Sequence, residues 1–438
     1  MTTRAATTGL LGAVGVLTVA PCVHAANPNI LVILADDLGY GDVHCYNVQR
    51  GKIPTPNLDR LATQGLRFTD AHSSSGVCSP SRYSLLTGRY HWRTGQAGIV
   101  SVFGPPMIAP ERLTLASLLR QHGYRTAAIG KWHLGWDWRI ATNQAALFHG
   151  MKPKDEEPPT DAQASAWREV FAKPIPGGPT TRGFDSYFGT DVPNWPPYCF
   201  IKNDRTLGVP SVLLPPRLVG NNQASLHGPA LPDWKLEPIL PTLCDRACDF
   251  IADAAIKREH FFLYLPLTSP HTPLAVAEEW KGRSQLNTYA DFVMQTDAVV
   301  GRVLDALEQN GVADETLVVF TSDNGCAPYI GVEELEKLGH FPSGPLRGYK
   351  SDVWEGGHRV PFIVRWPGVV TPGMEITAPV SNVDTFASAL GMLGVSVPDG
   401  VKQEGMDFSP LLRGQKVKWR DSISGQYDLH NGGQANMR

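Results

Sequence analysis

Asn29-Ile30-Leu31-Val32-Ile33-Leu34-Ala35-Asp36-Asp37 is the stretch that decides the fold. Its apolar core, residues 30–35, is typical of a strand buried on both faces of a sheet. Apolar side chains also recur at helical spacing, with Gly123 and Asn310-Gly311 where helices should end. Strands that alternate with helices predict an α/β fold with a large mixed, mostly parallel sheet sandwiched by helices. The other predicted strands are residues 125–129, 261–265, 316–320 and 361–365, and the predicted helices cover residues 113–119, 243–254 and 289–307.

Polar residues follow four of the five predicted strands at the point where each strand ends. In open α/β sheets, ligands bind beyond the carboxyl ends of the strands. Each group alone has an ordinary structural reading, as a turn, a helix cap or a structural histidine. Their occurrence at four strand ends favours one shared active site. The residues are Asp36 and Asp37, Lys131 and His133, His271, and Asp323 and Asn324.

The chemistry of these groups indicates ester hydrolysis. Carboxylate and amide oxygens are hard ligands that suit Ca²⁺ or Mg²⁺ better than zinc. The lysine and the two histidines supply the positive charge and the proton donors that an anionic transferring group requires. The combination predicts hydrolysis of an ester at phosphorus or sulfur.

Cys78-Ser79-Pro80-Ser81-Arg82 lies between the first two predicted strands. Pro80 can open a helix, which would leave Cys78 just before an N-terminus whose dipole favours an anion. An ordinary thiol at that position should be acidified and nucleophilic. A buried cysteine in front of a helix is the structural alternative.

The longer string around Cys78 resembles the signature of type I sulfatases, which are alkaline phosphatase-like hydrolases. Cys-x-Pro-Ser-Arg is followed by Leu-Leu-Thr-Gly-Arg at residues 85–89. Four more segments match the family in order, so the resemblance covers roughly residues 27–430. They are residues 29–42, 123–135, 269–273, and 346–357, the last of which contains Lys350 and Trp354-Glu355-Gly356-Gly357.

The resemblance implies a role for each residue. Asp36, Asp37, Asp323 and Asn324 would hold a calcium ion (or Mg²⁺), with Cys78, oxidised to formylglycine by a maturation enzyme, as a further ligand. The aldehyde hydrate at Cys78 would attack sulfur, and its second hydroxyl would later expel the sulfate. Arg82 and Lys131 would stabilise the hydrate and the charge on the transferred group. His271 and Lys350 would bind sulfate and protonate the leaving alcohol, and His133 would accept a proton from the second hydroxyl.

The N-terminus and the composition indicate an exported protein. Arg4, the apolar run 9–20 and Val23-His24-Ala25 predict a signal peptide over residues 1–25, too short for a stable membrane anchor. We therefore expect a periplasmic or secreted protein. The net charge of −3 over 438 residues gives no indication of nucleic-acid binding. Of the seven cysteines, some could form disulfides after export, and Cys244 and Cys248 lie one helical turn apart.

Domain boundaries and substrate are read from the remaining segments. We expect a catalytic domain over residues 26–395 and the start of a smaller C-terminal subdomain over residues 396–438. Relatives typically continue beyond this point with a strand pair and a helix, so the resemblance predicts that this subdomain is incomplete.

The irregular, Pro-, Gly- and Trp-rich segment 136–240 should contain the substrate determinants. Within it, Asn194-Trp195-Pro196-Pro197-Tyr198 could form an aromatic platform or simply pack onto the domain. The expected substrate is a sulfated carbohydrate, with aryl sulfates also hydrolysed. The alternatives are a phosphonate or phosphate monoester hydrolase of the same superfamily, and a non-catalytic carbohydrate-binding protein.

Overall fold

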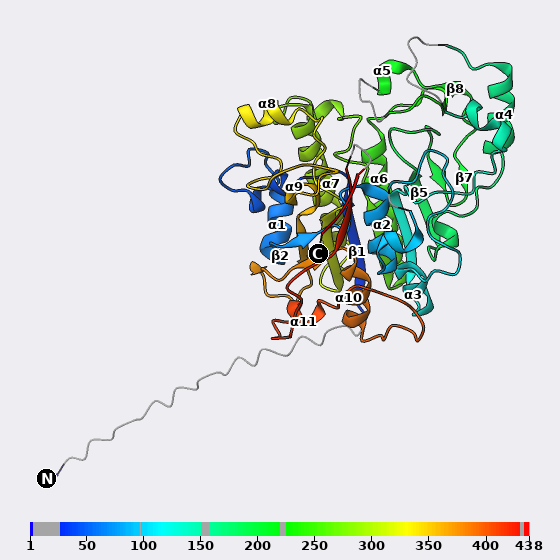
Figure 1. The fold of residues 1–438 in the computed structure, drawn as a ribbon. Helices are drawn as coiled ribbons and strands as arrows, with labels where there is room; N and C mark the ends of the chain where they lie inside the picture. The colour runs from blue at the N-terminus through cyan, green and yellow to red at the C-terminus, as the bar shows by residue number, and fades with distance from the viewer. Residues whose placement is uncertain (3–26, 97, 150–156, 220–224, 430–432, 438) are drawn as a thin grey trace.

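A ten-stranded sheet forms the centre of the molecule (Figure 1). The computed structural model describes residues 1–2, 27–96, 98–149, 157–219, 225–429 and 433–437. The predicted signal peptide therefore lies almost wholly outside the described residues. The strand order is β13-β2-β12-β11-β1-β10-β4-β5-β6-β7. The bounds of these strands, in the same order, are Met374–Ile376, Leu66–Phe68, Phe362–Arg365, Thr316–Ser322, Asn29–Ala35, Phe261–Pro266, Arg125–Lys131, Ser186–Thr190, Ile201–Lys202 and Arg205–Thr206.

The five central strands run parallel, and the antiparallel strands lie toward the two edges. Strand β1 pairs with both β11 and β10, β10 with β4, and β4 with β5, all in parallel. Strand β12 is antiparallel to β11 and to β2, and β6 is antiparallel to β5 and to β7. The predicted large mixed, mostly parallel sheet is confirmed.

Helices cover both faces of the sheet because successive residues of β1 point to opposite sides. Leu31 and Ile33 belong to a core shared with α1, α6 and α7, whereas Ile30 and Val32 belong to a core shared with α2, α3, α4 and α10. The helix bounds are Pro56–Gln64 (α1), Cys78–Thr87 (α2), Leu115–Gln121 (α3), Asp161–Phe171 (α4), Pro216–Val219 (α5), Ile239–Lys257 (α6), Thr288–Gln309 (α7), Val332–Lys337 (α8), Glu355–His358 (α9), Asp384–Leu393 (α10) and Ser409–Leu412 (α11).

Helix α7 illustrates how the sequence sets the ends of an element. The Asn287 side chain accepts a hydrogen bond from the backbone N–H of Ala290 at 3.0 Å, which satisfies one of the otherwise unpaired donors of the first turn. At the other end the chain turns at Asn310, and Gly311 adopts a φ of 69° that suits glycine.

Two glycines let three strands approach closely beside the site. A Cβ at Gly130 in β4 would lie 1.8 Å from the carbonyl oxygen of Pro266 in β10, and one at Gly189 in β5 would lie 1.8 Å from the carbonyl oxygen of Gly130. No side chain fits at either position. Lys131, the next residue of β4, is thereby held close to the strand ends of β10 and β1.

Short two-stranded sheets lie outside the central one. Strand β14 (Val380–Ser381) pairs in parallel with β3 (Ala71–His72), β8 (Val212–Leu213) pairs with β9 (Pro229–Ala230), and β15 (Gly425–Leu429) pairs with β16 (Gly433–Met437). The β15–β16 hairpin belongs to the predicted C-terminal subdomain, and the Gln426 N–H donates to the Ser74 carbonyl at 3.2 Å. The division at residue 395 stays a prediction.

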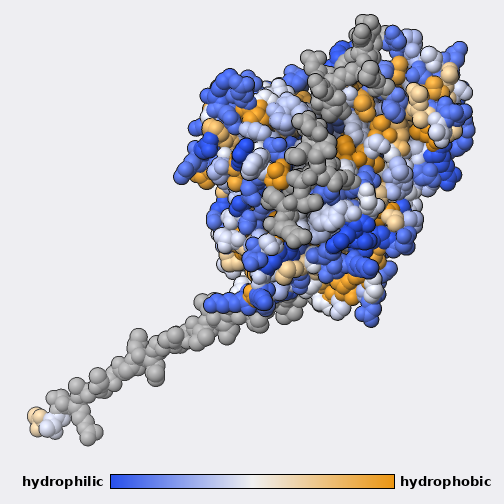
Figure 2. All heavy atoms as spheres, in the orientation of Figure 1, coloured by the Kyte–Doolittle hydropathy of each residue, from blue (hydrophilic) through white to orange (hydrophobic). Residues whose placement is uncertain are grey.

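The outer surface is mixed in character. Polar residues are interspersed with small groups of apolar residues on the face shown in Figure 2. Within the described part of the chain, none of the helices combines the length and the apolar character needed to cross a bilayer.

Candidate active site

The carboxyl ends of β11, β1, β10 and β4 meet at one edge of the sheet and bring the predicted site residues together. In the parallel ladder Ala35 lies beside Ser322, so Asp36 and Asp323 follow at neighbouring positions. The backbone N–H of Asp37 donates to Asp323 Oδ1 at 3.2 Å. The structure brings the groups from the four strand ends together at this one edge. Each of the seven strand-end residues is buried.

Asp36 is held between cations at the bottom of the site. Lys131 Nζ donates to Asp36 Oδ1 and Oδ2 at 3.0 and 2.7 Å, and Arg82 Nη2 lies 3.2 Å from Oδ1. Burial alone would raise the pKa of this carboxyl, but Lys131 and the other neighbouring cations hold it well below its usual range. Asp36 is therefore an anion in the folded protein.

Asp323 forms the most extensive ion pair of the site. Arg82 donates to Asp323 Oδ2 from Nε at 3.0 Å and from Nη2 at 2.7 Å, and Arg82 Nη1 donates to the Lys131 carbonyl at 3.0 Å. Both side chains of the ion pair are fully buried. Burial and the nearby Asp36 raise the pKa of Asp323 to about 6, although Arg82 opposes them.

Asp37, unlike Asp36, is paired with Lys350 and Asn324. Its backbone has a φ of 64°, an uncommon conformation for a residue with a side chain. Lys350 Nζ donates to Asp37 Oδ1 and Oδ2 at 2.6 and 2.8 Å, and Asn324 Nδ2 donates to Oδ1 at 2.8 Å. Burial would lower the pKa of Lys350, but Asp37 and Cys78 keep it well above its usual value.

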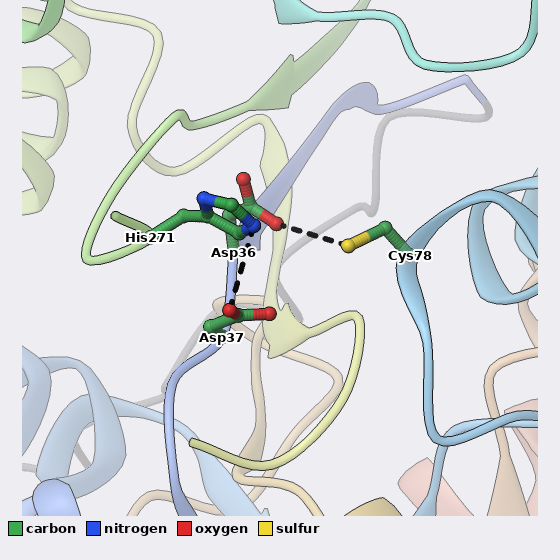
Figure 3. A group of neighbouring side chains, drawn as sticks. All are labelled: Asp36, Asp37, Cys78 and His271. Atoms are coloured by element: carbon green, nitrogen blue, oxygen red, sulfur yellow. Dashed lines mark hydrogen bonds and ion pairs between the residues drawn. The ribbon is translucent and has the colours of Figure 1, made fainter. Parts of the chain in front are cut away.

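Figure 3 shows four side chains that converge from three elements. Asp36 and Asp37 follow β1, His271 follows β10, and Cys78 begins α2. One potential ligand atom from each lies within 4.8 Å of the others. The Cys78 thiol is 3.5 Å from Asp36 Oδ1, and His271 Nε2 is 3.6 Å from Asp37 Oδ2.

The residues present fit a divalent cation with oxygen ligands. Asn324 Oδ1 is buried and has no hydrogen-bond partner, although Asn324 Nδ2 is engaged with Asp37. A buried amide oxygen without a donor beside two carboxylates is a suitable ligand for a hard cation. Asp323 is adjacent, but Arg82 and the Asp37 N–H already occupy its two oxygens.

The position of Cys78 agrees with the sequence only in part. Cys78 is the first residue of α2 and Val77 is the N-cap, so the helix begins two residues earlier than Pro80 suggests. The Sγ atom lies 3.6 Å from both Lys131 Nζ and Lys350 Nζ. The prediction of an acidified thiol was wrong, because burial and the Asp323 carboxylate raise the pKa of the Cys78 thiol to about 12.

The two histidines of the site are both neutral rings. His133 Nε2 donates to the Val100 carbonyl at 3.2 Å, which leaves Nδ1 as the proton acceptor. Burial and Lys131 keep the pKa of His133 well below its usual value. His271 Nδ1 donates to the Thr272 carbonyl, and burial lowers the pKa of His271 to about 4.

A pocket of about 160 Å³ opens onto Cys78. Its wall contains Trp195, whose ring lies edge-on to His133 with centroids 5.2 Å apart. Half of the lining residues, including Tyr329, were not predicted from the sequence, because they were not singled out in any motif and meet only in the folded chain. The lining residues are Val77, Cys78, Ile99, His133, Val192, Asn194, Trp195, His271, Pro328, Tyr329, Lys350 and Ser351.

The expected aromatic platform of residues 194–198 is divided between the pocket and the interior. Asn194 and Trp195 line the pocket, as one reading of the segment predicts. Tyr198 is buried instead, and its hydroxyl donates to the carbonyls of Asn194 and Leu226 at 2.8 and 2.6 Å. Only the first part of the segment can therefore contact a ligand.

The described cysteines are free thiols. Cys244 and Cys248 share α6, and their thiols point toward the carbonyls of Val299 and Arg302 in α7. The remaining free cysteines are Cys45, Cys78, Cys199 and Cys326.

Comparison with known proteins gives a consistent result. A family model described as Sulfatase matches residues 28–395. The chain is 32% identical to N-acetylgalactosamine-6-O-sulfatase of Bacteroides thetaiotaomicron, over 93% of this chain and 80% of the relative. It is 35% identical to steryl-sulfatase of Mus musculus, over 88% of this chain and 65% of the relative. A solved structure from work on glycosaminoglycan metabolism by Bacteroides thetaiotaomicron superposes with a TM-score of 0.78 and 29% identity, over 94% of this chain and 87% of the other.

Proposed function

The chain belongs to the sulfatase family, whose members hydrolyse sulfate esters, and we propose that it acts on a sulfated carbohydrate through a formylglycine derived from Cys78. One observation carries the proposal. Cys78 Sγ lies at the head of a buried helix, 3.6 Å from two lysine ammonium groups and 3.5 Å from the Asp36 carboxylate. A nucleophile placed there would meet an anionic ester that both lysines attract.

We assign the cation site to Asp36, Asp37, Asn324 and the atom at position 78, with Asp323 at its edge. The buried carboxylates and the unpartnered Asn324 oxygen support calcium, with Mg²⁺ as the alternative. When bound, the cation would polarise the sulfate and stabilise the charge that develops on its oxygens. Arg82 would keep Asp323 and Asp36 in place by the ion pairs described above.

Each remaining polar side chain has a role that fits its position. Lys131 and Lys350 would bind the sulfate oxygens, since each ammonium group lies 3.6 Å from Cys78 Sγ. Lys350 would supply the proton for the leaving alcohol. The single N–H of the neutral His271 ring donates to the Thr272 carbonyl, so His271 would assist only after its Nε2, 3.6 Å from Asp37, takes up a proton. His133 presents an unprotonated Nδ1, which would accept the proton from the second hydroxyl of the formylglycine hydrate.

The pocket wall supports a carbohydrate as the leaving group. Trp195 offers an aromatic face and Asn194 a polar side chain beside the opening. An aromatic ring can pack against the apolar face of a sugar while polar groups bind its hydroxyls. The N-acetylgalactosamine-6-O-sulfatase relative points the same way, and small aryl sulfates should also fit the pocket.

Export would supply the setting for this activity. The signal-like residues 1–25 support delivery to the periplasm or the medium, where sulfated polysaccharides are met. A maturation enzyme in the same cell would have to act on Cys78.

The decisive measurement is the intact mass of the peptide that contains Cys78, from protein made with and without a maturation enzyme. Conversion of the thiol to the aldehyde should remove about 18 Da. Rates on paired sulfate and phosphate monoesters should then favour sulfate. An unmodified thiol in the presence of an active maturation enzyme would refute the mechanism, and a preference for phosphate or phosphonate esters would support the alternative hydrolase.

A further inference from the structure

Two buried histidines outside the active site face each other through the same ring atom. His72 ends β3 and His358 ends α9, and both are almost fully buried. Their Nδ1 atoms are 2.9 Å apart. Glu355 lies beside them, and one potential ligand atom from each of the three residues lies within 4.8 Å of the others.

The other nitrogen of each ring fixes the position of its hydrogen. His72 Nε2 lies 2.8 Å from Asp70 Oδ1, and His358 Nε2 lies 3.1 Å from the Val353 carbonyl. A carbonyl and an ionised carboxylate can only accept, so each Nε2 carries a hydrogen and donates it. Each neutral ring then presents a lone pair at Nδ1, and the two lone pairs point at each other across 2.9 Å. That arrangement requires a cation at the pair.

We propose that His72, His358 and Glu355 form a binding site for a divalent transition metal ion, with Zn²⁺ as the best match. Two imidazole nitrogens and a carboxylate are an established type of zinc ligand set. Two nitrogens on a tetrahedral zinc lie ~3.3 Å apart, so the rings need to separate by only a few tenths of an ångström. The site differs in kind from the oxygen-rich cluster around Asp36.

The hydrogen bonds behind the rings are those expected of a metal site. Ligating histidines usually donate their second N–H to a carboxylate or a backbone carbonyl, which orients the ring and raises its basicity. Asp70 and the Val353 carbonyl occupy these two positions. Glu355 is half-buried, and one of its oxygens, Oε2, accepts from Arg359 at 2.8 Å.

The position of the site indicates a structural role. His72 begins the segment that leads to Cys78, and His358 ends the segment that follows Lys350. The Ser73 N–H donates to the His358 carbonyl at 2.8 Å, and the Ser351 N–H donates to the Gly76 carbonyl at 2.9 Å. A metal ion bound here would fasten the two segments that place Cys78 and Lys350 beside each other.

The test uses the full chain, freed of metal and then saturated with Ca²⁺, with Co²⁺ and Zn²⁺ as the added probes. Wild type should bind one equivalent of Co²⁺ with the visible absorption of a tetrahedral or five-coordinate site, and Zn²⁺ should displace it. His358→Gln should abolish this signal. Asp70→Asn should weaken binding by about 10–100-fold because it removes the partner behind His72. His44→Gln is the matched control, since His44 also faces a carboxylate, Asp59 at 3.0 Å, but lies at the surface.

Glu355→Gln keeps the proposal testable if His358→Gln fails to fold, because it preserves the shape of the side chain. The proposal requires Glu355→Gln to lose the Co²⁺ spectrum or weaken binding at least tenfold. It is overturned if wild type binds no Co²⁺, or if wild type and folded Glu355→Gln bind it equally. In either case, the cation between the two Nδ1 atoms would be a proton shared by the two rings.

Discussion

Removal of the Arg82 side chain should cost more stability than any other single change at the active site. Arg82 donates twice to Asp323, at 3.0 and 2.7 Å, and lies 3.2 Å from Asp36. Arg82→Met keeps an apolar stem but leaves both buried carboxylates without this cation. Removing one partner of a buried ion pair costs about 3–5 kcal/mol, so we expect the free energy of unfolding to fall by about 4 kcal/mol.

Urea unfolding followed by tryptophan fluorescence in the presence of a chelator measures this loss. Arg93→Met is the matched control, because Arg93 pairs with Glu404 at 2.6 Å but its side chain is 52% exposed. An exposed pair contributes little net free energy, because solvent and salt screen it. The deficit of Arg82→Met should also shrink between pH 7 and pH 5, because the pKa of Asp323 is already about 6 with Arg82 present and a protonated carboxyl needs no counterion.

Two results would refute the reasoning. Arg82→Met could lose no more stability than Arg93→Met, which would mean that the ion pair contributes little net free energy. Alternatively, the deficit could stay constant from pH 7 to pH 5, in which case unpaired carboxylates are not its cause. Either result would mean that the apolar packing of α2, and not the ion pair, stabilises this edge of the sheet.

Three further predictions concern the nucleophile, the pocket and a buried acid. Cys78→Ser, which has no thiol to oxidise and therefore no second hydroxyl, should release about one equivalent of alcohol and then stop as a sulfated protein, visible by intact mass; continued turnover would contradict the diol mechanism. Trp195→Ala should lower kcat/KM for a sulfated sugar roughly tenfold, while the exposed Trp354→Ala should not. Burial raises the pKa of Asp191 to about 6, so its contribution to stability is present below about pH 4 and is lost as the pH rises through 6. In Asp191→Asn, the urea midpoint should no longer fall for this reason between pH 4 and pH 7. If the midpoints of variant and wild type change with pH in parallel, Asp191 is not the cause of the loss.

The long, buried elements of the fold could be predicted from the sequence. The runs at residues 30–35 and 316–320 lie in β1 and β11, and the Asn310-Gly311 signal marks the end of α7. Strands β2, β5, β6, β7 and β13 were not predicted. They have two to five residues each, too few for an apolar period to stand out, and only pairing with neighbours defines them.

The candidate site also has a part that could be predicted from the sequence and a part that could not. Polar residues directly after strands were predictable, because strand direction alone carries them to one edge. The state of the Cys78 thiol was not, since its pKa depends on burial and on Asp323, which is 245 residues away. Half of the pocket wall was not predicted for a similar reason, because residues such as Ile99 and Tyr329 stand in no catalytic motif and acquire a role only from their neighbours in the fold.

The complete burial of α2 has a consequence for the order of events in the cell. Each of its ten residues, from Cys78 to Thr87, is buried in the folded protein, and Cys78 is reached only through the small pocket. Under the proposed function, a modifying enzyme would have to reach the peptide around the cysteine before α2 packs into the core. The proposed oxidation of Cys78 would then precede the closing of the sheet around it. The same short stretch would serve first as a substrate for another enzyme and only afterwards as a helix in the core.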